Sequence, residues 1–173
     1  MADEVELLLA EREIRRVIDT YARGVDRLDF DLVRACYWPD ATDDHGPYQG
    51  GVDGFIDYLG SALSGFESTM HILGNSLIDA DLSTGTARAE TYAVATHRLP
   101  HPEAPAIDWV CGLRYVDRFE RREGRWLIAR RVCAYEWART DPVVGKAGFG
   151  RHFVRGTRDA HDIVWHIMEP DTQ

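Results

Sequence analysis

Residues 107–137 read IDWVCGLRYVDRFERREGRWLIARRVCAYEW, and they predict a β-hairpin. β-branched and aromatic side chains are frequent in both halves of this stretch, as is typical of strands. The halves meet at Glu123-Gly124, a tight turn with charged residues at its tip. Two earlier runs, residues 71–79 and 86–99, have the same character and are separated by turn signals. The second part of the chain therefore predicts an antiparallel sheet.

The first part of the chain carries a helical pattern instead. Apolar side chains recur at helical spacing over the first long segment, at Ile14, Val17, Ile18, Tyr21 and Val25. A short second helix, capped by Asp29 or Asp31, is expected to end at Pro39, and a third is expected over 52–63. The turn-rich stretch 40–51 between them has room for one short strand or hairpin.

Helices followed by an antiparallel sheet predict an α+β fold. We expect a cone-shaped α+β barrel, in which the N-terminal helices pack on a strongly curved antiparallel or mixed sheet and enclose a pocket. At 173 residues, the chain has the size of one domain with a sizeable core. We place that domain at residues 1–140 and treat residues 141–173 as a C-terminal extension, a loop with a short helix.

Charge and composition exclude several classes of partner. The formal net charge of −9 opposes binding to nucleic acid and to anionic membranes, and no basic stripe offsets it. No apolar run approaches the roughly 20 residues that span a bilayer. The acidic N-terminus does not look like a secretory signal, and three cysteines without a C-x-x-C motif favour a reducing compartment. We therefore expect a cytoplasmic protein without nucleic-acid or membrane partners.

Three residues combine types that carry acid–base chemistry, namely Tyr21, Asp26 and His71. A histidine paired with a carboxylate is a general base, and a nearby phenol can donate a hydrogen bond to an oxygen that gains negative charge. Such a set suits removal of a proton next to a carbonyl, or elimination of water. Each residue also has an ordinary structural role, as a turn cap, a core phenol or a strand histidine. Spacing alone favours those structural roles.

The chain resembles the SnoaL-like branch of the nuclear transport factor 2-like superfamily over roughly its first four-fifths. The residues that carry the resemblance are Tyr21-x-x-x-x-Asp26, the strand start His71-x-x-Gly74 and the block from Gly112 to Trp126. Within this branch the chain is similar to the group of scytalone dehydratase, bile-acid 7α-dehydratase and hexachlorocyclohexane dehydrochlorinase.

The resemblance implies a cofactor-free lyase (dehydratase) or isomerase acting on a hydrophobic polycyclic, steroid-like or polyketide-derived carbonyl compound. His71 would abstract the proton, Asp26 would orient the ring and stabilise the imidazolium, and Tyr21 would polarise the carbonyl. The resemblance also implies a homo-oligomer, a trimer rather than a dimer. Two other functions stay open: a non-catalytic small-molecule-binding or scaffolding module, and the small subunit of an aromatic-ring dioxygenase.

Further side chains are candidates for the pocket, namely Tyr48, Phe55, His97, Trp109 and Arg131. His97 falls near the position of a second histidine that scytalone dehydratase uses. Pro100 follows soon after His97, so a place at the rim of the pocket is equally compatible with the sequence. For any single aromatic residue, a core position is favoured over a pocket position. Arg131 could face the pocket as a counter-charge for an anionic substrate, but a place at the surface or at a subunit contact is favoured.

The sequence gives no sign of a metal or nucleotide cofactor. Asp43-Asp44-His45 has the residue types of metal ligands, but consecutive residues rarely converge on one ion, and no partner cluster is evident. No glycine-rich phosphate-binding loop follows a strand. We therefore expect chemistry that uses side chains alone.

Overall fold

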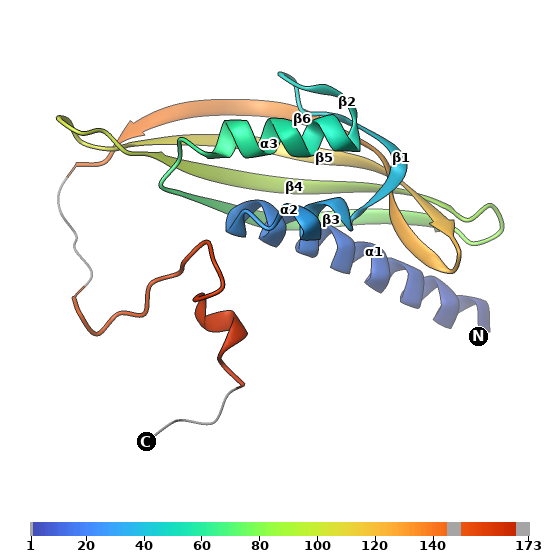
Figure 1. Cartoon of the computed structure of the whole chain (residues 1–173). Helices are drawn as coiled ribbons and strands as arrows, with labels where there is room; N and C mark the ends of the chain where they lie inside the picture. The colour runs from blue at the N-terminus through green and yellow to red at the C-terminus, as the bar shows by residue number, and fades with distance from the viewer. Residues whose placement is uncertain (1, 145–149, 169–173) are drawn as a thin grey trace.

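The helices of the protein cover one face of a curved, six-stranded sheet (Figure 1). The computed structural model describes residues 2–144 and 150–168. The helices and strands, in chain order, are α1 (Ala2–Arg27), α2 (Phe30–Arg34), β1 (Tyr37–Asp44), β2 (Gln49–Gly51), α3 (Val52–Leu63), β3 (Ser68–Asp81), β4 (Thr86–Leu99), β5 (Ile107–Arg122), β6 (Arg125–Pro142) and the 3-10 turn η1 (Ile163–Trp165).

The sheet is mixed, and it curves without closing into a barrel. Its strand order is β2-β1-β6-β5-β4-β3, and all neighbours are antiparallel except β1 and β6. Register shifts interrupt the β3–β4 and β5–β6 ladders, and such irregularities bend strands and increase their twist. The predicted fold class, helices packed on a curved sheet, is confirmed.

The hairpin between β5 and β6 has the turn that its sequence predicts. Arg122 pairs with Arg125, so the loop consists of two residues. Glu123 has a φ of 54° and Gly124 a φ of 78°, as a type I′ turn requires at both central positions. This turn matches the natural twist of two antiparallel strands. The second strand is longer than predicted and runs on to Pro142.

The start of the chain follows the prediction for α1 but not for the segment after it. The apolar stripe of α1 is buried, with Ile14, Ile18, Tyr21 and Val25 at most 3% exposed. The Asp29 carboxylate caps α2 by accepting the N–H of Leu32 at 3.0 Å. The expected end of this helix at Pro39 is wrong, because α2 ends at Arg34 and Pro39 lies in β1. The β1–β6 pairing shifts register across this position, and a proline is tolerated at such irregularities.

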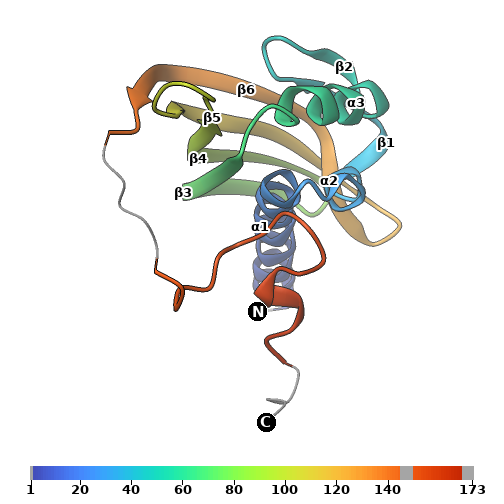
Figure 2. The same cartoon turned by 60° about the vertical axis from the view of Figure 1, so that its left-hand side comes forward.

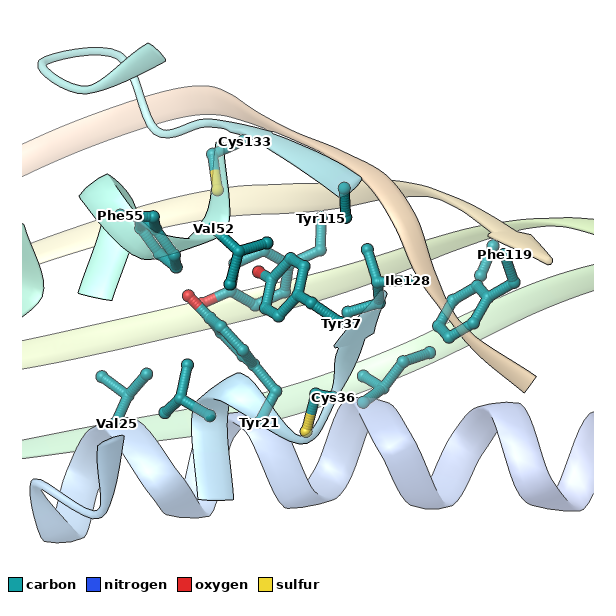
Figure 3. Close-up of a cluster of buried hydrophobic side chains, with 14 of the residues drawn as sticks. Tyr21, Val25, Cys36, Tyr37, Val52, Phe55, Tyr115, Phe119, Ile128 and Cys133 are labelled. Atoms are coloured by element: carbon teal, nitrogen blue, oxygen red, sulfur yellow. The ribbon is translucent and has the colours of Figure 1, made fainter. Parts of the chain in front are cut away.

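A buried ion pair joins β5 to β6 in the core. Asp117 lies directly opposite Arg131, and two hydrogen bonds of 2.7 Å connect the guanidinium to the two carboxylate oxygens. Both side chains are 0% exposed. The guanidinium stacks on the rings of Tyr21 and Tyr115, at 4.1 and 4.3 Å from their centroids. Figure 3 shows Tyr21 rising from α1 toward Tyr115 and Phe55 in this cluster.

The favoured prediction for Arg131, a place at the surface or at a subunit contact, is wrong. Its position on β6 faces the covered side of the sheet, where Asp117 of the neighbouring strand neutralises it. Burial opposes the charge of Arg131, but the carboxylate of Asp117 outweighs burial and raises the pKa of the guanidinium well above its ordinary value. Arg131 is therefore a permanent buried cation.

Removing one partner of this pair should destabilise the protein strongly. We expect Asp117→Asn to lower the free energy of unfolding by about 3–5 kcal/mol, because it leaves a buried charge uncompensated. Urea unfolding at neutral pH measures this change. The exposed pair Arg88–Asp79 provides the control, since its side chains are 76% and 70% exposed, and Asp79→Asn should change the stability by less than about 1 kcal/mol. Equal effects of the two substitutions would contradict the interpretation.

The C-terminal segment returns to α1 of the same chain (Figure 2). The guanidinium of Arg23 stacks on the ring of Trp165, 4.6 Å from the ring centroid. The described part of this segment holds the single 3-10 turn η1. Residues 145–149 and 169–173 of the predicted extension lie outside the described residues, and the division into domain and extension stays a prediction.

We searched residues 2–144 and 150–168 for a helix that could cross a membrane. No helix there combines the length and the apolar character that crossing a bilayer requires.

Candidate active site

The carboxylate of Asp26, in the last turn of α1, binds His71 at the start of β3. Oδ1 of Asp26 lies 2.7 Å from Nδ1 of His71, and Oδ2 accepts the backbone N–H of His71 at 2.8 Å. Burial raises the pKa of Asp26, but the hydrogen bonds and the charge of His71 outweigh it, and the net pKa is lowered. Because an ionised carboxylate only accepts, Nδ1 of His71 carries a proton; when the ring holds one proton, Nε2 is left with its lone pair.

His71 faces a cavity of about 220 Å³ between the helices and the sheet. The wall includes Tyr21, Val25, His45, Leu59, Phe66, His71, Ala95, His97, Trp109 and Tyr115. Asp26 lies behind His71, where a groove on the outer side of α1 also reaches both residues. The base therefore faces an apolar cavity, while its carboxylate partner is 15% exposed toward the groove.

Tyr21 brings a hydroxyl group to the same cavity. Burial raises the pKa of Tyr21 well above its ordinary value, although the charge of Arg131 acts in the opposite direction. The phenol therefore keeps its proton at neutral pH and can donate a hydrogen bond. Its oxygen lies 3.4 Å from Nε2 of His45. Tyr21 and His71 thus both line this cavity, and Asp26 is bound to His71; the catalytic role of the three residues stays a prediction.

His97 and Trp109 also line the cavity. The two rings lie 4.8 Å apart, and the ring of His97 meets that of His71 edge-on at 5.6 Å. Burial, together with the neighbouring charge of His71, lowers the pKa of His97 to about 4. In the described part of the chain, no group hydrogen-bonds its buried Nδ1. His97 is thus a neutral imidazole in the cavity wall.

Three other predicted pocket residues lie behind the wall instead of on it. Phe55 is fully buried beneath the ring of His45, at 4.7 Å between centroids. Tyr48 donates its hydroxyl proton to the carbonyl of Gly51 at 2.5 Å. Arg131 lies beneath the ring of Tyr21, held by Asp117 as described above. The wall of the cavity does not include Tyr48, Phe55 or Arg131, and a contact of these residues with a substrate stays a prediction.

Sequence reasoning missed a second histidine–carboxylate pair. Nδ1 of His45 lies 2.6 Å from Oδ1 of Asp43, and Oδ2 of Asp43 accepts the hydroxyl of Tyr37 at 2.7 Å. Asp43 lies near the end of β1 and His45 directly follows that strand, so continued alternation turns both side chains toward the same face. This spacing is the signal in the sequence for the pair, because it turns the side chain of Asp44, between them, to the opposite face.

The described residues do not include a cluster of side chains that could bind a metal ion. No group of three or more His, Cys, Asp or Glu side chains lies close enough there to hold an ion. The arrangement instead combines an imidazole base, a phenolic donor and an apolar wall. These groups can move a proton and stabilise a developing oxyanion.

A curved sheet with helices on one face, and a cavity between them, defines the class of nuclear transport factor 2-like folds. The chain matches the SnoaL-like domain over residues 6–132, and it belongs to this family. The resemblance stated from the sequence is thereby confirmed.

Relatives by sequence have no described function. The chain is 30% identical over 128 residues to the uncharacterized proteins Rv2910c of Mycobacterium tuberculosis and Mb2934c of Mycobacterium bovis, which covers 69% of this chain and 81% of each relative.

Solved structures share the fold at lower identity. A protein from Novosphingobium aromaticivorans, provisionally assigned as a scytalone dehydratase, is 24% identical with a TM-score of 0.69, over 86% of this chain and all of that chain. A type 2 hexachlorocyclohexane dehydrochlorinase is 17% identical with a TM-score of 0.74, over 85% of this chain and 99% of the other.

His97 should make stability depend on pH. Its pKa is about 4 in the folded protein and about 6.5 in the unfolded chain, so the unfolded chain binds more protons between these values. Stability is therefore fully present above about pH 6.5 and is lost as the pH falls toward 4, by at most about 3 kcal/mol. We expect His97→Phe to flatten this loss, measured by urea unfolding at several pH values.

The matched control is the exposed residue His101, whose substitution His101→Phe should leave the pH dependence as in the wild type. A wild-type slope that survives in His97→Phe would show that another group is responsible.

Proposed function

We propose that the protein is a cofactor-independent lyase of the dehydratase type, or an isomerase, that removes a proton next to a carbonyl group. The observation that carries the proposal is the contact between Asp26 and His71, which leaves Nε2 of His71 facing an apolar cavity. A base in such a site is shielded from water, while its carboxylate partner stabilises the imidazolium that forms.

The proposed mechanism uses three residues. Nε2 of His71 takes the proton from the carbon beside the carbonyl, and Asp26 stabilises the positive charge. Tyr21 donates a hydrogen bond to the carbonyl oxygen, on which negative charge develops. In a dehydration, the imidazolium of His71 then returns its proton to the departing hydroxide.

The cavity favours a hydrophobic substrate of modest size. Its volume of about 220 Å³ is below the roughly 300–1,000 Å³ that is usual for sites of drug-sized ligands. Of the proposed substrates, a polyketide-derived or other ketone of one or two fused rings therefore fits better than a steroid. The names of two structural neighbours, a dehydratase and a dehydrochlorinase, both describe eliminations and support the reaction class.

The test uses β-hydroxy ketones fused to one aromatic ring, beginning with β-hydroxytetralone, whose loss of water gives a fluorescent naphthol. We expect the wild type to accelerate water loss above the spontaneous rate, and His71→Gln to lower the enzymatic rate by about 10²–10⁴-fold. His101→Gln is the matched control and should keep the wild-type rate. The proposal fails if no ketone of the panel loses water faster with the wild type, or if His71→Gln keeps the full rate.

We also propose that copies of the chain associate through the open face of the sheet, as a trimer in preference to a dimer. This face carries exposed apolar side chains from neighbouring strands, among them Met70, Ile72, Tyr92, Val94 and Trp137. A contiguous apolar patch on a sheet usually marks an interface.

Introducing negative charges on that face of the sheet should prevent copies of the chain from associating. We expect the wild type to sediment as a trimer and the double variant Ile72→Asp, Val94→Asp to sediment as a monomer at micromolar concentration. The control is Leu8→Asp, an exposed apolar residue of α1, which lies on the other side of the sheet. A monomeric wild type would contradict the proposed assembly.

A further inference from the structure

The mechanism above leaves the pair of Asp43 and His45 without a use. The carboxylate of Asp43 is fully buried and binds Nδ1 of His45 with one oxygen and the hydroxyl of Tyr37 with the other, at 2.6 and 2.7 Å. The ring of His45 also stacks on Phe55. The ring is therefore fixed in place, and its Nε2 lies on the side of the Tyr21 hydroxyl.

The sheet places His45 and His71 on opposite walls of the cavity. His45 directly follows β1, and His71 lies on β3, with β6, β5 and β4 between these strands. Both side chains nevertheless line the same cavity, because the sheet curves around it. A molecule in the cavity thus has the base on one side and His45 on the other.

Tyr21 and His45 can hold one substrate oxygen together. The hydroxyl oxygen of Tyr21 and Nε2 of His45 are 3.4 Å apart. An acceptor oxygen can therefore lie within about 2.7–3.1 Å of both atoms, which is the geometry of a two-donor oxyanion site. Tyr21 supplies its own proton, because its phenol stays neutral. His45 becomes the second donor when Nε2 is protonated.

Buried charged groups lie around His45. Arg131 is a buried cation, and Asp117 and Asp43 are buried carboxylates close to one another. The carboxylate of Asp43 lies 2.6 Å from Nδ1 of His45, where it can stabilise a positive charge on the ring during proton transfer. The thiol of Cys133, 3.3 Å from Nε2, adds no charge, because burial raises its pKa well above the ordinary value. Burial keeps the phenols of Tyr21 and Tyr37 neutral in the same way.

From this geometry we propose that His45 is a further catalytic residue, which binds the substrate carbonyl oxygen together with Tyr21 and delivers a proton to it. Asp43 is its positioning residue. The inference rests on the proposed function in one respect, namely that the ligand is a carbonyl compound whose neighbouring carbon loses a proton to His71.

The proton transfers balance. Nε2 of His71 takes the carbon-bound proton, the released electron pair forms the C=C bond of an enol, and the carbonyl oxygen takes the proton of His45. When water is lost, the enol returns that proton to His45 and its oxygen re-forms the C=O bond. The electron pair of the enol C=C bond moves to form the new C=C bond, the C–O bond breaks, and the hydroxide takes the proton from His71.

The first test is deuterium exchange at the carbon beside the carbonyl of α-tetralone, followed by NMR in D₂O. This ketone has no leaving group, so exchange needs the base and the oxygen site but no elimination. We expect His45→Phe, which keeps a ring against Phe55, to slow enzymatic exchange by about 10²–10³-fold. His71→Gln should abolish it, and His101→Phe should leave it unchanged.

The second test needs no reaction. α-Naphthol binds as an analogue of the enol of α-tetralone, with its oxygen in the proposed site, and its fluorescence reports binding to the intact protein. We expect His45→Phe to weaken binding about ten-fold or more, as for loss of a charged hydrogen bond. Asp43→Asn should weaken it in the same direction, whereas His71→Gln should change it little. Circular dichroism establishes that each variant is folded.

The outcomes separate the two proposals. Wild-type exchange that is slowed in His45→Phe, without dehydration of any β-hydroxy ketone, would contradict the dehydratase while supporting the site of His45. Wild-type exchange that persists in His45→Phe but is lost in His71→Gln would overturn the role of His45 alone. If the wild type exchanges nothing, naphthol binding decides, and equal affinities of wild type and His45→Phe would overturn the inference.

Discussion

The contact between Asp26 and His71 determines both how α1 sits on the sheet and what the cavity can do. Both carboxylate oxygens of Asp26 are used by one residue of β3, through its ring and its backbone. The end of α1 is thereby fixed to an edge strand of the sheet. The same contact fixes the tautomer of the imidazole and turns Nε2 toward the cavity. Moving α1 along the sheet would lose both effects together.

Several close contacts allow α1 to reach that position. A Cβ atom on Gly24 would lie 2.8 Å from Cγ2 of Val33, so only glycine lets α2 cross so near the end of α1. The carbonyl of Gly24 also accepts the N–H of Asp29, which begins the turn into α2. On the other side of the cavity, the pair of Arg131 and Asp117 supports the ring of Tyr21 from below. A rigid aromatic and ionic layer therefore holds the phenol that faces the substrate.

The sequence was sufficient to predict the fold class, because each of the four long strands β3, β4, β5 and β6 carries its own local signal. β4 has the predicted bounds, and Glu123-Gly124 forms the expected two-residue turn. Local signals failed at Pro39. A proline can end a helix or lie at an irregularity of a strand, and here the pairing of β1 with β6, which is distant in the sequence, decides between the two. They failed at Arg131 for the same reason, since its partner Asp117 is defined by strand pairing.

The candidate site was predictable only in part. Tyr21, Asp26 and His71 were found through the family pattern, although 45 positions separate the two residues of the pair. Asp43 and His45 have the residue types of metal ligands, but consecutive residues rarely converge on one ion. The sequence cannot show that their side chains instead pair with each other and with Tyr37 and Tyr21. Tyr48 and Phe55 lie near the cavity but behind its wall, a difference that side-chain packing alone decides.

The most direct measurement of the central claim is the position of the proton on the ring of His71. Two-bond proton–nitrogen NMR correlations distinguish the two tautomers of a neutral imidazole. The contact with Asp26 predicts a proton on Nδ1 in the wild type and loss of this preference in Asp26→Ala, with the tautomer of His101 unchanged. A proton on Nε2 in the wild type, or the same Nδ1 tautomer in Asp26→Ala, would contradict the assignment of His71 as a base oriented by Asp26.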